Sequence, residues 1–121
     1  MALQESGEMY LETIYVLSKA NPHVRSVDIS EHMGYSKPSV SRAVHILEED
    51  GYLAFDDDGF ILLTDSGRAV AEKIFERHTV IASMLMRLGV DPKTAAEDAC
   101  RMEHALSDAS FQAIKRHAQQ F

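Results

Sequence analysis

The stretch best equipped for chemistry is Asp98 to His104, which holds the only cysteine of the chain. Cys100, Glu103 and His104 stand at positions i, i+3 and i+4, a spacing that places three side chains on one face of a helix. A thiolate, a carboxylate and an imidazole on one face can bind a first-row transition metal. The alternative is that Cys100 is a small buried apolar side chain beside a solvated helix face.

Composition limits the class of protein that these residues belong to. A chain of 121 residues with 45% apolar residues predicts one compact unit, with room for two sub-lobes. The sequence predicts neither a transmembrane helix nor a signal peptide, since it has no apolar run of 18 residues and no basic N-terminal segment. One cysteine suits a reducing compartment, so we expect a cytoplasmic protein with no membrane partner.

Charge is distributed unevenly along the chain. The net charge of −7 argues mildly against a nucleic-acid partner. From His32 to Leu47, however, the sequence contains no Asp or Glu, while Lys37, Arg42 and His45 lie in that segment. A locally basic strip inside an acidic protein can still contact phosphates.

The acid-free strip coincides with a predicted helix-turn-helix. Helices are expected over residues 6–19, 27–33 and 37–50, with Ser6, Ser26 and Ser36 as N-caps and a stop at Gly34. A tight turn followed by a helix that begins with serine and basic residues is typical of DNA readers, although ordinary helical hairpins are more common. Arg42 is the best candidate for reading guanine, and Pro38 could contact a thymine methyl group. The candidate DNA-binding residues are Ser36, Lys37, Pro38, Ser39, Ser41 and Arg42.

The remaining segments predict a wing and a helical C-terminal part. Two β-prone runs, 52–55 and 60–63, flank Asp56-Asp57-Asp58-Gly59 and predict a hairpin whose acidic tip would repel DNA. Helices are expected from Thr64 or Asp65 to about 88, over 92–106 and over 107–118, the first packing on the N-terminal helix and on a partner subunit. The expected fold is mostly α with a small β-hairpin. Residues 1–64 would form a winged helix-turn-helix domain, and residues 65–121 a helical metal-binding and dimerisation domain.

Four motifs in this order resemble the diphtheria-toxin-repressor family of metal-dependent bacterial transcriptional regulators. They are Glu8-Met-Tyr-Leu-Glu-Thr-Ile-Tyr15, Ser36-Lys-Pro-Ser-Val-Ser41, Leu63-Thr-Asp-Ser-Gly-Arg68 and Ala99-Cys-Arg-Met-Glu-His104. The similarity covers nearly the whole chain, and the combination is specific although each piece alone is weak. It implies a homodimer, and the two-fold symmetry of a dimer implies a palindromic double-stranded DNA operator.

The resemblance also implies a ligand set. In the iron-responsive branch a methionine of the first helix joins the cysteine, glutamate and histidine, and the matching residues are Met9, Cys100, Glu103 and His104. The manganese-responsive branch has Asp in place of that methionine and Glu in place of that cysteine. Thioether and thiolate suit Fe(II) better than Mn(II), so Fe(II) is the expected cofactor and Mn(II) the alternative; Ni(II), Co(II) or Zn(II) could bind in vitro.

A second metal site is implied less completely. His78 matches the first ligand of the ancillary site of the iron branch, but the other two ligand positions fall on Ala82 and Ala96. The manganese branch instead uses a glutamate at the position of Glu12 together with the same histidine. A hybrid site from Glu12, His78 and Glu103 is therefore a hypothesis, against the alternative that His78 is a partly buried core residue. Many iron-branch members carry a third, SH3-like domain, which the 121 residues are too few to include, so either this family member is short or the sequence is part of a longer chain.

The expected function is a metal-activated, DNA-binding repressor of metal homeostasis genes, with Fe(II) as the activator. The alternatives are a manganese-responsive regulator of the same fold, or a winged-helix regulator that senses no metal and whose Cys100 is inert or redox-sensing. An enzyme built on Cys100 and His104 is not expected, because no orienting Asn or Asp motif and no glycine-rich phosphate loop accompany the pair. No small-molecule substrate is expected either.

Overall fold

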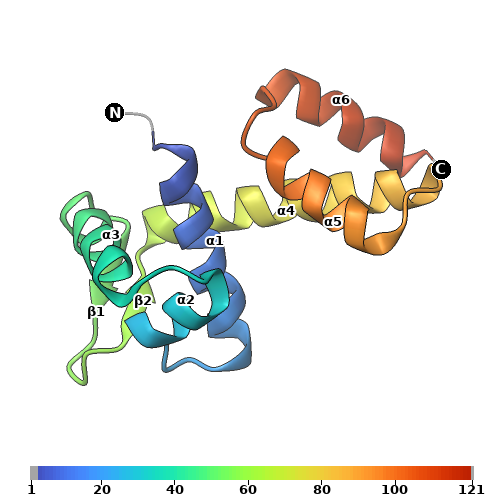
Figure 1. The fold of residues 1–121 in the computed structure, drawn as a ribbon. Coiled ribbons are helices and arrows are strands. Elements are labelled where there is room, and N and C mark those ends of the chain that lie inside the picture. Colours follow the sequence, from blue (N-terminus) through green and yellow to red (C-terminus); the bar gives the residue numbers. More distant parts are fainter. Residues whose placement is uncertain (1–2, 121) are drawn as a thin grey trace. The chain divides into compact units, whose positions relative to one another are not determined.

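The computed structural model describes residues 3–120, which form two compact units divided between Glu72 and Lys73. Figure 1 shows the helices and the two-stranded antiparallel sheet of the described residues. The elements are α1 (Glu5–Ala20), α2 (Ser26–Met33), α3 (Lys37–Glu49), β1 (Leu53–Phe55), β2 (Ile61–Leu63), α4 (Asp65–Arg87), α5 (Pro92–Met102) and α6 (Asp108–Gln119). The predicted fold, mostly α with a small β-hairpin, is confirmed.

The N-terminal unit is built on an apolar core shared by α1, α2, α3, the hairpin and the start of α4. Val40, Val44 and Leu47 of α3 are buried, as their spacing predicts. Val70 and Ala71 of α4 also belong to this core. For that reason the two units divide inside α4, whereas the predicted domain boundary at residue 64 falls just before this helix.

Local capping explains where the helices of the winged helix-turn-helix (α1 to β2, hereafter the reading head) begin and end. The Ser36 hydroxyl accepts a hydrogen bond from the backbone N–H of Ser39 at 3.3 Å, and Pro38 lies in the first turn of α3. Gly34 ends α2 with φ 76°, a conformation that costs glycine little. Ser6, by contrast, lies inside α1 and does not cap it, because Gln4 occupies the N-cap position without a side-chain cap bond.

The cap of α2 also differs from the prediction. Ser26 is the first residue of this helix, and Arg25 occupies the N-cap position. The Asp28 carboxylate accepts the backbone N–H of Arg25 at 2.9 Å. The Asp28 carboxylate thus satisfies the backbone donor of the N-cap residue itself, whereas a serine cap would accept an N–H group of the first helical turn.

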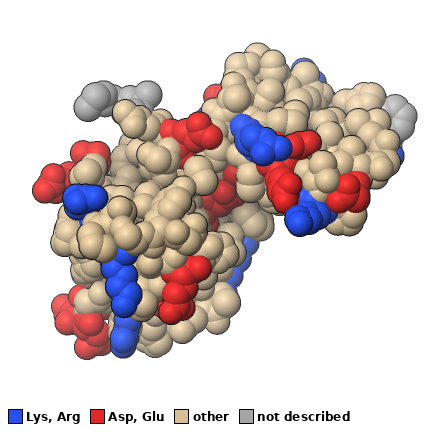
Figure 2. Space-filling model, in the orientation of Figure 1, with Lys and Arg blue, Asp and Glu red and all other residues tan. Residues whose placement is uncertain are grey.

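The antiparallel hairpin of β1 and β2 forms the predicted wing. Leu53 pairs with Leu63 and Phe55 with Ile61. In the turn, the Asp56 carboxylate accepts the backbone N–H groups of Asp58 and Phe60, each at 2.9 Å. Figure 2 shows acidic side chains gathered at the tip of this hairpin, at the lower left.

A glycine permits the close junction between the hairpin and α4. A Cβ atom on Gly67 would lie 2.0 Å from the carbonyl oxygen of Tyr52, far inside van der Waals contact. The Thr64 hydroxyl donates to the carbonyl of Gly51 at 2.7 Å and accepts the N–H of Gly67 at 3.2 Å. Thr64 therefore caps α4 and ties it to the end of the reading head.

The C-terminal unit packs the rest of α4 with α5 and α6. Its buried apolar side chains are those of Ile74, Ile81, Ala95, Ala99 and Phe111. The predicted break before α5 is present, since the Asp91 carboxylate accepts the N–H of Thr94 at 3.0 Å. Among the described residues, no helix combines the length and apolar character that crossing a membrane requires.

Candidate metal centre

The C-terminal unit brings together three side chains with metal-binding atoms. His78 comes from α4, Cys100 from α5 and Glu103 from the position that caps the end of α5. His78 Nδ1 lies 3.0 Å from Glu103 Oε2 and 3.8 Å from Cys100 Sγ. The three ligand atoms all lie within 4.8 Å of one another.

These separations fit a single transition-metal ion. Metal–nitrogen and metal–sulfur bonds of about 2.0 and 2.3 Å place two ligands of one ion roughly 3–3.7 Å apart. The observed distances need only small side-chain shifts to reach that range. One thiolate, one imidazole and one carboxylate form a mixed donor set that suits Fe(II), Co(II), Ni(II) or Zn(II) better than a purely oxygen-binding ion.

The carboxylate at the middle of the cluster is completely buried. Glu103 Oε2 faces His78, and its Oε1 lies 3.3 Å from Nε2 of His104. The Glu103 side chain is 0% exposed, while that of His78 is 27% exposed and Cys100 lies at the surface. A buried carboxylate is costly unless it is partnered, so two imidazoles at its two oxygens are the expected compensation.

The helix that carries this cluster is shorter than predicted. α5 ends at Met102, and residues 103–105 form a turn, whereas the sequence predicted helix to residue 106. Glu103 keeps its helical bond to the Ala99 carbonyl at 2.9 Å, so Cys100 and Glu103 remain neighbours one turn apart. His104 approaches the Glu103 carboxylate from the turn rather than from the helix face.

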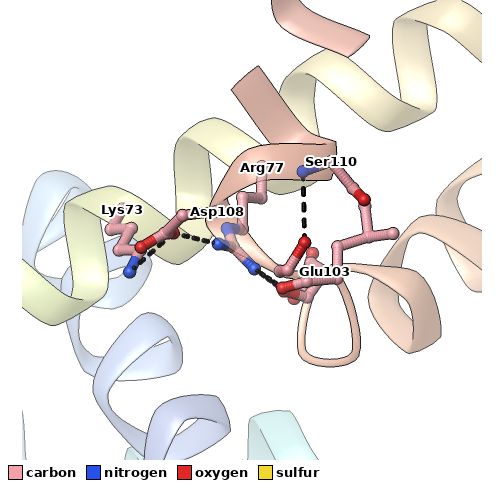
Figure 3. A network of polar contacts seen from close by, with 7 residues as sticks. Lys73, Arg77, Glu103, Asp108 and Ser110 are labelled. Atoms are coloured by element: carbon pink, nitrogen blue, oxygen red, sulfur yellow. Dashed lines mark hydrogen bonds and ion pairs between the residues drawn. The ribbon is translucent and has the colours of Figure 1, made fainter. Parts of the chain in front are cut away.

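A buried arginine that sequence reasoning missed explains this early end. Arg77 is 5% exposed, and its Nη1 donates to the carbonyls of Glu103 at 3.1 Å and Leu106 at 2.6 Å. Its Nη2 donates to Asp108 Oδ1 at 2.5 Å, as Figure 3 shows. The backbone carbonyls thus bond to a side chain of α4, and the chain turns towards α6 instead of continuing the helix.

A signal for this arginine was present in the sequence. Arg77 follows Ile74 by three residues and precedes Ile81 by four, so a cation stands inside the apolar stripe of α4. A second cation, Lys73, lies 3.0 Å from Asp108. The Lys73 ammonium and the Arg77 guanidinium hold the pKa of the Asp108 carboxyl below its usual range.

Met9 and Glu12, the two predicted ligands outside this unit, lie on α1 of the N-terminal unit. They are three residues apart and half-buried, and this spacing places them on one helix face. Their part in metal binding stays a prediction. Ala82 and Ala96 are half-buried and supply no ligand atom, so the ancillary set of the resemblance is missing two of its three side chains.

The predicted DNA-contacting side chains lie at the start of α3. Lys37, Pro38 and Arg42 are exposed, whereas Val40 and Val44 of the same helix are buried. Ser36 is also exposed, and its hydroxyl donates to the Ser39 hydroxyl at 2.9 Å, whereas Ser39 and Ser41 are half-buried. The arrangement leaves one guanidinium and one ammonium available to a nucleic acid, and the DNA-binding roles stay predictions.

Both halves of the chain match domain models of one known protein family. Residues 2–59 match the N-terminal DNA-binding domain of iron-dependent repressors, and residues 64–121 match the metal-binding and dimerisation domain of iron-dependent repressors. The chain is 33% identical over 121 residues to an uncharacterised HTH-type transcriptional regulator of Methanocaldococcus jannaschii, covering 98% of this chain and 97% of that protein. It is also 33% identical over 107 residues to the diphtheria toxin repressor of Corynebacterium diphtheriae.

The relatives differ in how much of their own length the match covers. The match to the diphtheria toxin repressor covers 88% of this chain but 47% of that protein. The HTH-type transcriptional regulator MntR of Listeria monocytogenes is 33% identical over 109 residues, which cover 90% of this chain and 77% of that protein. The solved structure of the manganese regulator SloR superposes with a TM-score of 0.84 at 28% identity, covering 98% of this chain and 55% of that one. The chain therefore belongs to the family of iron-dependent repressors, the metal-dependent transcriptional regulators that include the diphtheria toxin repressor.

Proposed function

We propose that this protein is an Fe(II)-activated repressor of metal homeostasis genes that acts in the cytoplasm as a homodimer on a palindromic operator. The observation that carries the proposal is the cluster of His78, Cys100 and Glu103, whose ligand atoms lie within 4.8 Å of one another. Membership of a metal-dependent repressor family supports the metal-dependent, DNA-binding part of this statement. The thiolate of Cys100 supports Fe(II) over Mn(II) as the activator, because Mn(II) prefers oxygen ligands.

The chain's own residues would couple metal binding to DNA binding. Cys100 and Glu103, with His78 and His104 beside the Glu103 carboxylate, would hold the ion from the C-terminal unit, and Met9 would hold it from α1 of the N-terminal unit. A bound cation supplies positive charge that offsets the buried Glu103 carboxylate. Ligands on both units would then favour the arrangement in which two recognition helices reach successive major grooves. A coupling of about 1–3 kcal/mol changes DNA affinity roughly 5- to 150-fold.

The reading head would contact DNA through the start of α3. Arg42 is exposed and has the bidentate geometry that guanine recognition requires. Lys37 would neutralise a phosphate, and Pro38 would contact a thymine methyl group. Ser36, Ser39 and Ser41 would position the helix on the backbone. The acidic tip of the hairpin argues that the wing does not contact the phosphates closely.

A manganese-responsive regulator is the second candidate. His78 and Glu103 lie 3.0 Å apart and supply nitrogen and oxygen ligands, to which Glu12 could add a second carboxylate. The solved structure of SloR named above is that of a manganese regulator. The match to a metal-binding domain disfavours the hypothesis of a winged-helix regulator that senses no metal.

Anaerobic DNA binding separates these candidates. Operators would first be selected from random duplexes with the metal-loaded protein, and affinity would then be measured with Fe(II), with Mn(II) and without metal. We expect Fe(II) to tighten binding and Cys100→Ala or Met9→Ala to remove the effect. The control is Glu97→Gln, an exposed acid of α5 outside the cluster, which should respond as wild type does.

A ligand exchange tests the choice of metal directly. Cys100→Glu replaces the thiolate by the carboxylate that the manganese branch carries at this position. We expect the variant to need less Mn(II) and more Fe(II) for half-maximal DNA binding than the wild type does. A wild-type protein that responds equally to both metals would refute the argument from ligand softness. A protein whose DNA binding ignores every metal would refute the sensor itself.

A further inference from the structure

We propose that Arg77 is a positioning residue of the metal centre, which holds the backbone of Glu103 so that its carboxylate stays beside His78 and Cys100. This inference rests on the proposed function, since it takes Glu103 to be a metal ligand. All residues involved belong to the C-terminal unit. The role is distinct from ligation, because a guanidinium has no free lone pair for a metal ion.

Two consecutive residues of α4 hold Glu103 at its two ends. Arg77 Nη1 donates to the backbone carbonyl of Glu103 at 3.1 Å, and His78 Nδ1 lies 3.0 Å from the side-chain Oε2 of the same residue. Figure 3 shows the guanidinium between Glu103 and Asp108. The turn that carries Glu103 and His104 is thereby fixed to the helix that carries His78.

The two contacts respond differently when a metal is bound. His78 Nδ1 and the Glu103 carboxylate offer the same atoms to each other and to an ion, so their mutual contact is exchanged when they act as ligands. The bond from Arg77 uses the backbone carbonyl of Glu103 and is available in both states. Arg77 therefore maintains the distance between α4 and Glu103 while the ligand atoms change partners, which lowers the cost of ordering the site.

Burial explains why arginine suits this position. The guanidinium bonds two carbonyls and one carboxylate, and its Cζ lies 5.3 Å from the centre of the Phe111 ring. A planar fork with five donors can serve these directions at once, whereas a lysine ammonium is a single point at the end of a flexible stem. Arg77→Lys should therefore keep the positive charge beside Asp108 but only part of the hydrogen bonding to the carbonyls of Glu103 and Leu106.

Cobalt binding to the full chain tests the proposal with a signal from Cys100. Anaerobic Co(II) titration, with a competing chelator, would follow the thiolate-to-cobalt charge-transfer absorbance. We expect Arg77→Met to raise the Kd for Co(II) about 10- to 100-fold, the usual cost of losing a partner that orients a ligand. Arg77→Lys should fall between this variant and wild type. Titrations would be run well below the melting temperature of each metal-free variant, where a purely structural role leaves the Kd unchanged.

Arg101→Met is the matched control. Arg101 is an exposed arginine next to Cys100 in the sequence, and it pairs with Asp98 one turn earlier on α5. Its removal should leave the Kd for Co(II) as in wild type. Wild-type affinity in a folded Arg77→Met protein would overturn the positioning role.

A second variant covers the case in which Arg77→Met does not fold. Asp108→Asn removes the charge that faces the guanidinium at 2.5 Å and Lys73 at 3.0 Å, and so weakens the orientation in which Arg77 Nη1 donates to the two carbonyls. We expect it to weaken Co(II) binding in the same direction, by less than Arg77→Met, and an unchanged Kd in this variant would overturn the proposal. Failure of the proposed function looks different: the wild type itself would show no thiolate-to-cobalt band, or Cys100→Ser would bind Co(II) as wild type does.

Discussion

The two units of this protein bury different kinds of side chains. In the N-terminal unit, the described core is apolar, and its eleven buried residues include no charged group. In the C-terminal unit, two charged side chains, Arg77 and Glu103, are buried beside Ile74, Ile81 and Phe111. The energetic cost of a buried charge depends on its partners. A bound ion can therefore change the free energy of unfolding of the C-terminal unit far more than that of the N-terminal unit. We therefore expect the N-terminal unit to supply stability and the C-terminal unit to respond to a bound ion.

The largest expected effect is a cavity in the apolar unit. Leu11 is completely buried, and Leu11→Ala should lower the free energy of unfolding by about 2–5 kcal/mol. Urea unfolding monitored by circular dichroism measures this loss. Leu62→Ala, an exposed leucine of the same unit, should change stability by about 0.5 kcal/mol or less. Equal losses in the two variants would show that the apolar core does not stabilise this unit.

Replacing the buried carboxylate of Glu103 should cost the metal-free protein much less stability than the cavity at Leu11 does. Glu103→Gln keeps the shape of the side chain but removes a buried charge, so the metal-free protein should lose little stability or gain some. The stabilisation by metal, about 2.7 kcal/mol at a free concentration 100 times Kd, should disappear. Thermal unfolding with and without Co(II) measures both quantities, with Glu97→Gln as the exposed control. If the variant were still stabilised by Co(II) as strongly as the wild type, Glu103 would not be a ligand.

A smaller effect distinguishes two serines of the reading head. Ser36 caps α3 by accepting the N–H of Ser39, whereas Ser6 makes no cap bond for α1. Ser36→Ala should cost about 1 kcal/mol of unfolding free energy and Ser6→Ala close to none. Urea unfolding of the two variants side by side measures the difference. A greater loss at Ser6 would contradict the observed start of α1.

The smallest effect concerns pH and the ion pairs of Asp108. Lys73 and Arg77 hold the pKa of this carboxyl below its usual range, so the unfolded chain binds a proton more readily than the folded chain does. The stabilisation is therefore complete above the unfolded pKa and is lost as pH falls through the folded pKa. The stability difference between wild type and Asp108→Asn, measured by urea unfolding from pH 6 downwards, should shrink below about pH 4. A difference that grows on acidification would reverse the sign of this argument.

Local signals accounted for most of the helix and strand positions. Ser36 before Lys37-Pro38, Asp91 before Pro92 and Ser107 before α6 each cap the helix that the sequence predicted. Such caps are read from adjacent residues, because the side chain bonds a backbone group within three positions. The prediction was wrong at the starts of α1 and α2, where Gln4 and Arg25 occupy the cap positions. Neither of these residues is a preferred cap, so sequence preference alone could not identify them.

The candidate site was predictable in its residue types but not in its connections. Cys100, Glu103, His104 and His78 could be selected from the sequence, because thiolate, carboxylate and imidazole groups are the side chains that bind transition metals. The resemblance placed His78 with Glu12 and Glu103 in a hypothetical second site and did not join it to Cys100. In the folded unit its Nδ1 lies 3.0 Å from Glu103 and 3.8 Å from Cys100, across 25 and 22 residues of chain. The periodicity of the sequence identifies neighbours within one helix or strand, but it gives no information about the distance between two helices.

The sequence by itself therefore determined the helices, the wing and the metal-binding chemistry of the chain, because these depend on short-range capping, alternation and ligand type. Only the tertiary structure decided that α5 stops at Met102, that His78 lies beside Cys100 as well as Glu103, and that Arg77 bonds to the turn that begins at Glu103. The reason is that a buried guanidinium needs acceptors wherever packing supplies them, and here packing supplied the carbonyls of a helix end 26 residues further along the chain.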